Sequence, residues 1–152
     1  MKKSVDRLSL AKSMSQQCIA VRIRLLNRIV TNIYDSALSP FGVKLNQISI
    51  LVFVHLSGEV GYDALCRRLK MEKSTASRNI ERMKRKGWLK IVTVKEERIK
   101  LLRLTPAGEI LLASVQEAWE DAQEKARILL GEEGTEALCN IANGIWKKDR
   151  AR

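Results

Sequence analysis

The feature that most constrains this sequence is the basic segment from Lys73 to Lys86. Its apolar residues Ala76, Ile80 and Met83 recur at i, i+4 and i+7, which places them on one face of a helix. The opposite face carries short hydroxyls and guanidinium groups, contributed by Ser74, Thr75, Ser77, Arg78, Arg82 and Arg85. Hydroxyls can approach a phosphate or a base edge closely, and guanidinium groups can bind guanine bidentately. The segment therefore predicts a helix that lies in a DNA major groove.

The residues before this segment predict a second helix at a steep angle to it. Leu65 and Leu69 lie four residues apart on a short helical pattern. The connection at 70–72 is as short as a helix-turn-helix requires.

The residues after this segment predict a β-hairpin. Gly87 is expected to end the helix, and two β-rich runs follow at 88–94 and 99–104. The charged tip between them contains Lys95 and Arg98. We expect this hairpin to form a wing that contacts DNA through both cations.

The positive charge is local. Residues 63–100 contain 13 Lys and Arg against 5 Asp and Glu, which is +8 of the formal net charge of +11. Such a patch on a helix-turn-helix pattern indicates nucleic acid rather than a membrane surface as the partner. No apolar run approaches the roughly 18 residues of a membrane span, and charged residues interrupt any signal-peptide core. We therefore expect a cytoplasmic protein.

The residues that usually build catalytic or metal sites are sparse. The cysteines, Cys18, Cys66 and Cys139, are widely spaced, and His55 is the single histidine. This pattern predicts neither a disulfide framework nor a metal site. The sequence has no Gly-rich phosphate loop and no G-x-S-x-G motif, so we expect no cofactor and no enzymatic activity.

Both ends of the chain predict long apolar helices. The first ends near Leu38, and the second begins at Thr105-Pro106, breaks at Gly131 and resumes at 135–147. A central buried helix is expected at 46–57, with Asn46 as its N-cap. The terminal helices carry more apolar surface than a small domain needs, so we expect them to interleave with those of a second copy.

These motifs resemble the MarR-type winged helix-turn-helix transcription regulators. The resemblance rests on KSTASRNIERMKRKGWL, on Arg98 and on LTPAGE, and it extends outward to RLLNRIVTNIYDSALSPFGVKLNQISIL and AWEDAQ. It implies a single domain over 1–152 that is mainly α with a small β-hairpin wing. A winged helix-turn-helix region at 43–105 would be flanked by dimerisation helices at 8–38 and 106–148.

The resemblance also implies site residues. DNA contacts would come from Ser74, Thr75, Ser77 and Arg78 in the major groove and from Arg98 in the minor groove. We expect the neighbouring cations Lys73, Arg82, Arg85 and Lys95 to contact DNA as well. Ile91 and Ile99 depart from the family pattern, which places basic or small residues there. A small apolar or phenolic effector would bind near Tyr34, Asp35 and Trp119, although packing roles explain these residues equally well.

Cys18 is a candidate thiol sensor. A thiolate at this position would react with an oxidant if a cation such as Arg22, one turn further on, lowered its pKa. The alternative is a small buried hydrophobe at the dimer seam, which we favour because buried cysteine is common.

The expected function is regulation of transcription by a homodimer that binds a pseudo-palindromic operator as a repressor and is released by a small effector. Two alternatives remain open. One is an architectural or RNA-binding winged protein that binds without sequence preference. The other is a regulator whose input is cysteine oxidation.

Overall fold

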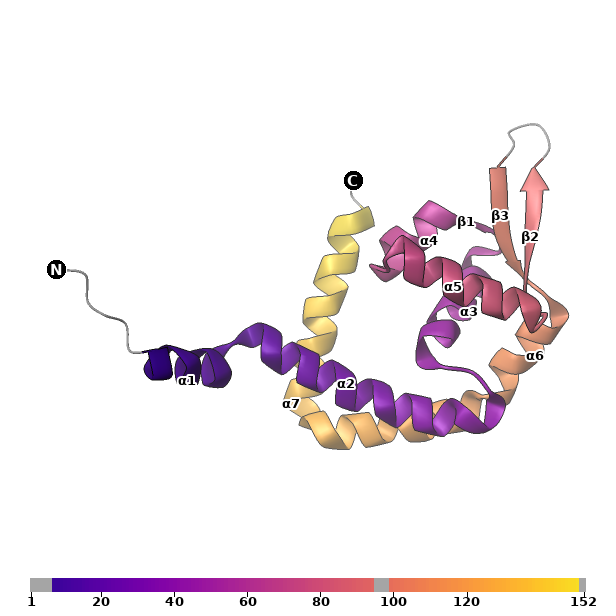
Figure 1. Ribbon diagram of the computed structural model, residues 1–152. Coiled ribbons are helices and arrows are strands. Elements are labelled where there is room, and N and C mark those ends of the chain that lie inside the picture. Colours follow the sequence, from indigo (N-terminus) through magenta and orange to yellow (C-terminus); the bar gives the residue numbers. More distant parts are fainter. Residues whose placement is uncertain (1–6, 95–98, 151–152) are drawn as a thin grey trace.

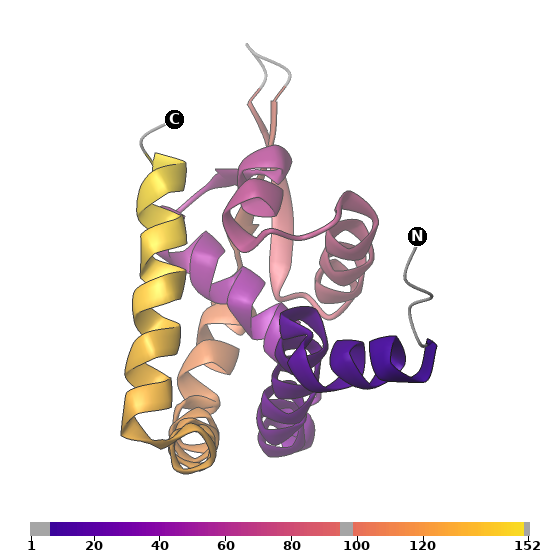
Figure 2. The same ribbon diagram turned by 90° about the vertical axis from the view of Figure 1, so that its left-hand side faces the viewer.

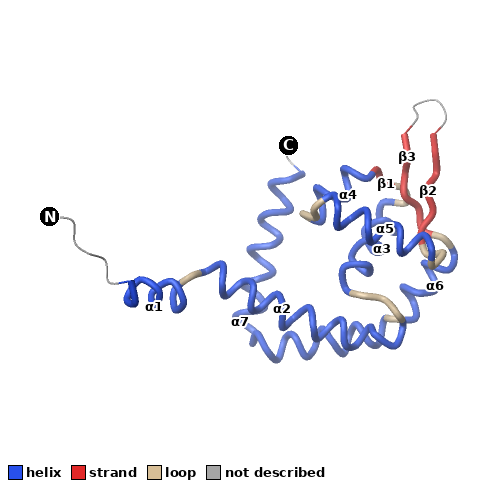
Figure 3. The backbone as a smooth tube through the Cα atoms, viewed as in Figure 1, coloured by secondary structure: helices blue, strands red, loops and turns tan. Residues whose placement is uncertain are grey.

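The computed structural model describes residues 7–94 and 99–150, and it shows a mainly helical protein with a small antiparallel sheet at one side (Figures 1 and 3). The elements in chain order are α1 (Arg7–Gln17), α2 (Ile19–Leu38), the 3-10 helix η1 (Ser39–Phe41), α3 (Leu45–Ser57), β1 (Val60–Gly61), α4 (Tyr62–Leu69), α5 (Lys73–Arg85), β2 (Leu89–Val94), β3 (Ile99–Leu104), α6 (Pro106–Ser114) and α7 (Gln116–Arg150). The mainly α fold class with a small β wing is confirmed.

Helix α3 is the centre of the core, as its apolar sequence predicts. Its Ile50, Leu51 and Val54 have no exposed surface. They belong to one buried cluster with Leu65 of α4 and Met83 of α5. Because burying one such aliphatic side chain stabilises a fold by about 1.5–3 kcal/mol, this cluster fixes the helix pair on the rest of the domain.

The start of α3 differs from the prediction. Its N-cap is Lys44 rather than Asn46. The backbone N–H of Leu45 donates to Asp35 Oδ1 at 2.8 Å, and that of Lys44 donates to Gln47 Oε1 at 3.1 Å. Asp35 belongs to α2, so the cap comes from another helix, and a local motif could not reveal it. The carboxylate also lies at the helix end that favours negative charge.

The sheet has the order β1-β3-β2 and is antiparallel throughout. The hairpin of β2 and β3 pairs Leu89 with Leu104 and Val94 with Ile99, which confirms the predicted wing strands. Strand β1 was not predicted from the sequence. It pairs Val60 with Leu102 along the other edge of β3, and two residues are too few to give a periodic signal.

Two predicted helices are divided in the structure. The helix expected over 8–38 breaks at Cys18, whose backbone is extended (φ −67°, ψ 113°), so that α1 and α2 are separate. The helix that starts at Thr105 is interrupted at Val115 and continues as α7. Its start is confirmed, because the Thr105 hydroxyl accepts a hydrogen bond from the Gly108 N–H at 3.1 Å.

Helix α7 bends at Gly131, as predicted. This residue has φ 70° and ψ 172°, a combination that favours glycine. The part before the bend packs along α2, and the part after it turns back toward α4 (Figures 1 and 2). The C-terminal part of the chain therefore lies beside the helix-turn-helix.

The terminal helices expose much apolar surface. The large hydrophobic residues exposed on them include Ile19, Ile23, Leu25 and Leu26 of α2, and Ile128, Leu138, Ile141 and Ile145 of α7. Among the described residues, no single helix has the length and hydropathy of a membrane span, although α2 with η1 and α3, bent by 77°, meet those two criteria jointly.

Candidate nucleic-acid interface

Helix α5 presents the two faces that its sequence predicts. Ala76 and Met83 are fully buried, and Ile80 is 4% exposed. The outward face carries the exposed residues Ser74, Ser77, Arg78, Arg82 and Arg85, whereas Thr75 is half-buried. Residues 74, 78, 82 and 85 follow at intervals of four, four and three, so they form one stripe along the helix. Hydroxyls lie at its N-terminal half and guanidinium groups along the rest.

The first turn of α5 is held by α4. The Tyr62 hydroxyl donates to the carbonyl oxygen of Lys73, and Lys73 Nζ lies 2.8 Å from Asp63 Oδ1. The hydrogen bond and charge of Lys73 hold the pKa of Asp63 below its usual 3.8, and Asp63 in turn raises the pKa of Lys73. Lys73, a predicted DNA contact, is therefore already paired in the free protein. Tyr62 and Asp63 were not predicted to take part.

The last turn of α5 is tied to two other segments. Lys86 Nζ donates to the carbonyl oxygen of Gly42 at 2.6 Å and lies 4.6 Å from the centre of the Trp88 ring. Gly42 has φ 65°, and a β-carbon there would come within 3.3 Å of Lys86 Nζ. These contacts fix the end of α5 relative to the wing. A contact across 44 residues leaves no local signal in the sequence.

The described part of the wing consists of its two strands. Lys90 and Lys100 are exposed on it, and Ile91 and Ile99 are 40% and 43% exposed. The predicted DNA contacts Lys95 and Arg98 lie outside the described residues.

The residues expected near an effector or sensor do not form one site within the chain. Cys18 is half-buried at the start of α2, and Arg22 Nη1 donates to its carbonyl oxygen at 3.4 Å. Tyr34 lies twelve residues further along the same helix than Arg22, a rise of about 18 Å. The Tyr34 hydroxyl donates to Gln123 on α7, one turn beyond the partly exposed Trp119. Burial raises the pKa of Tyr34, and Arg127 partly offsets that rise.

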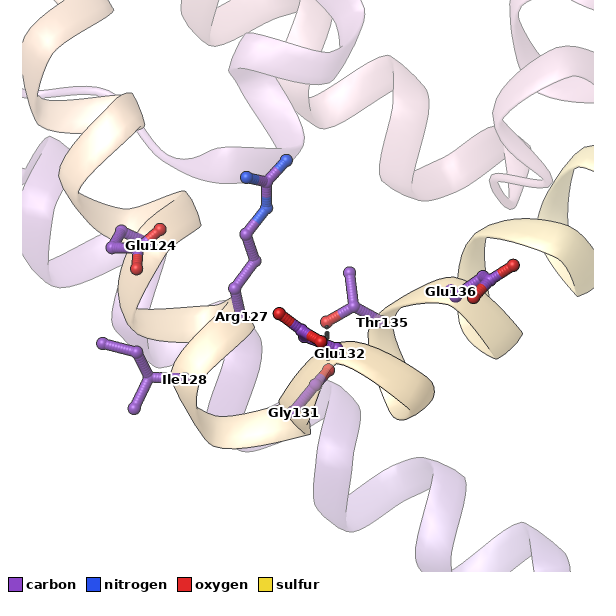
Figure 4. A pocket seen from close by; sticks show the side chains of 7 residues that line it. All are labelled: Glu124, Arg127, Ile128, Gly131, Glu132, Thr135 and Glu136. Atoms are coloured by element: carbon purple, nitrogen blue, oxygen red, sulfur yellow. Dashed lines mark hydrogen bonds between the residues drawn. The ribbon is translucent and has the colours of Figure 1, made fainter.

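A hollow of about 590 Å³ lies on the inner side of the bend in α7 (Figure 4). It was not predicted. Its lining residues are Glu124, Arg127, Ile128, Gly131, Glu132, Thr135 and Glu136. Its charged lining residues are three carboxylates and Arg127, and the Thr135 hydroxyl donates to the Gly131 carbonyl at 2.7 Å (Figure 4). The hollow lies on the terminal helices rather than on the face of α5.

The helix pair with its outward basic stripe, followed by a two-stranded wing, defines a winged helix-turn-helix protein. Residues 41–98 match the family model of the MarR family. This match and the solved structures described below support a MarR-type winged helix regulator, and the MarR family consists of DNA-binding transcription regulators rather than enzymes. The family predicted from the sequence is confirmed.

Solved structures support the same fold. A mutant of MarR from E. coli complexed with operator DNA superposes with a TM-score of 0.77 at 16% identity, over 88% of this chain and 96% of that one. The M. tuberculosis transcriptional regulator MosR superposes with a TM-score of 0.74 at 26% sequence identity, over 90% of this chain and 98% of that one. BpsR of Bordetella bronchiseptica superposes with a TM-score of 0.74 at 18% sequence identity, over 86% of this chain and 95% of that one. No curated protein sequence matches the chain.

Proposed function

We propose that the protein is a homodimeric repressor that reads a pseudo-palindromic operator with one α5 helix per half-site. The observation that carries this proposal is the stripe on α5, where exposed hydroxyls and guanidinium groups lie opposite a fully buried apolar face. Arginine in this setting can bind guanine bidentately, and serine can contact either base edges or phosphates. The similarity to a MarR mutant complexed with operator DNA supports the same orientation.

The contact residues follow from that orientation. Ser74, Ser77 and Arg78 would face the groove, while Arg82 and Arg85 would extend toward phosphates. Thr75 would contribute from its half-buried position, and Lys73 would do so once it leaves Asp63. Lys95 and Arg98 would reach DNA from the tip of the wing.

Dimerisation through the terminal helices at 8–38 and 106–148 is supported by their exposed apolar residues. Ile19 is 73% exposed, Ile128 is 74% exposed and Ile141 is 66% exposed. The charges are complementary as well, since residues 7–28 contain five basic and no acidic residues, and residues 117–136 contain seven acidic and two basic ones. The winged region at 43–105 would then be placed twice, once in each half-site.

Control by a small molecule is part of the proposal. Regulation of DNA binding by 6-hydroxynicotinic acid is known for the similar BpsR. An apolar or phenolic effector bound between α2, α7 and the winged region, near Tyr34 and Trp119, would release DNA by favouring one spacing of the two α5 helices. We assign repression rather than activation because a protein can repress transcription simply by occupying the operator.

The proposal is tested by selecting bound fragments from random duplex DNA. A two-fold symmetric motif is expected, with specific binding at least about a thousandfold tighter than binding to random DNA. Arg78→Ala should lose about 1–3 kcal/mol of discrimination. Arg98→Ala, the comparison variant, should weaken binding to all DNA sequences by a similar factor. Enrichment of no motif, or equal affinity for duplex RNA, would favour the architectural alternative instead.

A further inference from the structure

The turn that joins α5 to β2, at 86–88, contacts both connections between the winged region and the terminal helices. On one side, Lys86 Nζ donates to the Gly42 carbonyl oxygen at 2.6 Å. Gly42 ends η1, which directly continues α2. On the other side, the Thr105 backbone N–H donates to the Trp88 carbonyl oxygen at 3.1 Å. Thr105 is the N-cap of α6, which leads into α7, and Figure 1 shows the ends of α5 and α2 and the start of α6 at the same side of the molecule.

The two sides of this turn are held differently. On the α6 side, a β-carbon at Gly108 would lie 2.3 Å from the Trp88 carbonyl oxygen, so the two backbones are in direct contact. On the η1 side, the contact is made by the side chain of Lys86, which reaches the Gly42 carbonyl across the space between the two segments. The α6 side is therefore fixed by backbone packing, whereas the η1 side depends on the lysine.

The position of Lys86 favours a charged hydrogen bond. The last carbonyl groups of a helix lack partners within it and carry partial negative charge, and Gly42 provides such a carbonyl at the end of η1. A hydrogen bond from an ionised donor is roughly twice as strong as a neutral one, and the Trp88 ring, 4.6 Å away, attracts the same ammonium group. Lys86 is exposed, so water screens part of this attraction. Its loss should therefore loosen the connection without unfolding the domain.

We infer that Lys86 is a positioning residue that fixes the spacing between the two α5 helices of the dimer, and thereby the separation of half-sites that the protein accepts. This inference rests on the proposed homodimer and its operator. Dimer contacts made by α2 and α7 can fix the position of α5 only through the connections to the winged region. Asp35 connects α2 to α3, whereas Lys86 connects the segment after α2 to the end of α5 itself. Without Lys86 the winged region could tilt about its contact with α6, and several spacings would be bound with similar affinity.

The test measures the affinity of the full chain for operators of altered spacing. One base pair is inserted between the half-sites of the motif selected from random duplex DNA, which rotates one half-site by about 35° relative to the other. The parent should bind the inserted operator at least about tenfold more weakly than its own. Lys86→Met should reduce this ratio about three- to tenfold, because the contact is lost in both chains. Lys86→Arg should keep most of the ratio, since a guanidinium can donate to the same carbonyl and stack on the indole.

Lys84→Met is the matched control. Lys84 lies in the last turn of α5, and its ammonium group pairs with Glu81 of the same helix at 2.8 Å. This variant removes the same charge from the same end of the helix but leaves the contact with η1 intact. It should keep the spacing ratio of the parent, and both variants should lose a similar amount of affinity for random duplex DNA. Thermal unfolding of each variant checks that the fold is kept.

Amide hydrogen exchange of the free protein gives a second measurement that needs no operator. Lys86→Met should exchange faster than the parent at 39–45 and 83–88, whereas Lys84→Met should exchange like the parent at 39–45.

The outcomes separate this inference from the proposed function. An unchanged spacing ratio in Lys86→Met, an equal fall in Lys84→Met, or unchanged exchange at 39–45 would overturn the role of Lys86 and leave the proposed function intact. Equal binding of both spacings by the parent would do the same. A parent that selects no two-fold symmetric motif would overturn the proposed function, and the role of Lys86 with it.

Discussion

The winged region and the terminal helices differ in how completely each buries its own apolar residues. Leu51 of α3 and Leu65 of α4 have no exposed surface, whereas Ile23 and Leu25 of α2 are 60% and 55% exposed. Both regions are rich in apolar residues, so composition alone does not distinguish them. The winged region is therefore folded around a core of its own, while the terminal helices leave an apolar face exposed. An exposed apolar surface of this extent marks an interaction site.

The largest expected effect comes from placing a charge on the face of α2. Ile23→Glu should convert a dimer of twice the 17.3 kDa chain mass into monomers. In a symmetric interface each chain contributes the substituted residue, so the dimer would have to bury two carboxylates. Light scattering at micromolar concentration measures this. Leu56→Glu is the control, since Leu56 is 78% exposed but belongs to the winged region. A parent that is monomeric across dilution and salt would remove the proposed distinction between the two regions.

The next effect concerns the core of the winged region. Leu51→Ala should reduce the free energy of unfolding by about 2–5 kcal/mol, because it leaves a cavity in a fully buried cluster. Urea denaturation followed by circular dichroism measures the loss. Leu56→Ala should change the free energy of unfolding by less than about 0.5 kcal/mol. Similar losses in the two variants would contradict the burial difference.

A smaller effect is expected at the junction of the two regions, where Asp35 of α2 caps α3. Asp35→Ala leaves the Leu45 N–H without its acceptor and should cost about 0.5–2 kcal/mol in thermal or urea unfolding. Asp35→Asn keeps an acceptor oxygen and should recover most of that loss. Equal losses for both variants would show that the charge, rather than the hydrogen bond, connects the regions.

Within the winged region, Asp63→Asn should free Lys73 for DNA phosphates. Affinity for random duplex DNA is expected to rise a few-fold, and the log-log salt slope should steepen by up to about 0.9. The rise should vanish in a Lys73→Gln background. Because the folded-state pKa of Asp63 is lowered, the ion pair is fully present above the usual 3.8 and is lost as pH falls through the lowered value. An unchanged salt slope would mean that Lys73 stays clear of DNA.

The smallest effect is expected from Cys18→Ser in the terminal region. This thiol is half-buried at the break between α1 and α2. We expect the variant to bind operator DNA like the parent, and mild peroxide to release neither protein. Release of the parent alone by peroxide would favour the redox alternative over an effector. A mixed disulfide or sulfenate at this break would then be the input.

The sequence predicts the winged region better than the connections around it. The faces of α5, the wing strands and the start at Thr105 depend on periodicity and caps within a few residues. The tertiary cap from Asp35, the strand β1 and the tie between Lys86 and Gly42 depend on segments brought together by folding, so they leave no local pattern. The pairing of Lys73 with Asp63 is of the same kind. The sequence singled out Lys73 as a candidate DNA contact, but it could not show that Lys73 is paired with Asp63 in the free protein.

The sheet order also bears on how the protein behaves at high concentration. β3 lies in the middle, β1 shields only part of its far edge, and the outer edge of β2 is open over Leu89–Val94. An unpaired edge with valine and isoleucine is a template for strands of other molecules. Lys90 is the one charge on this strand, and its repulsion of a like strand weakens as salt rises. The wing, which we propose as a DNA-contacting element, is therefore also the place where aggregation would begin in concentrated, high-salt solution.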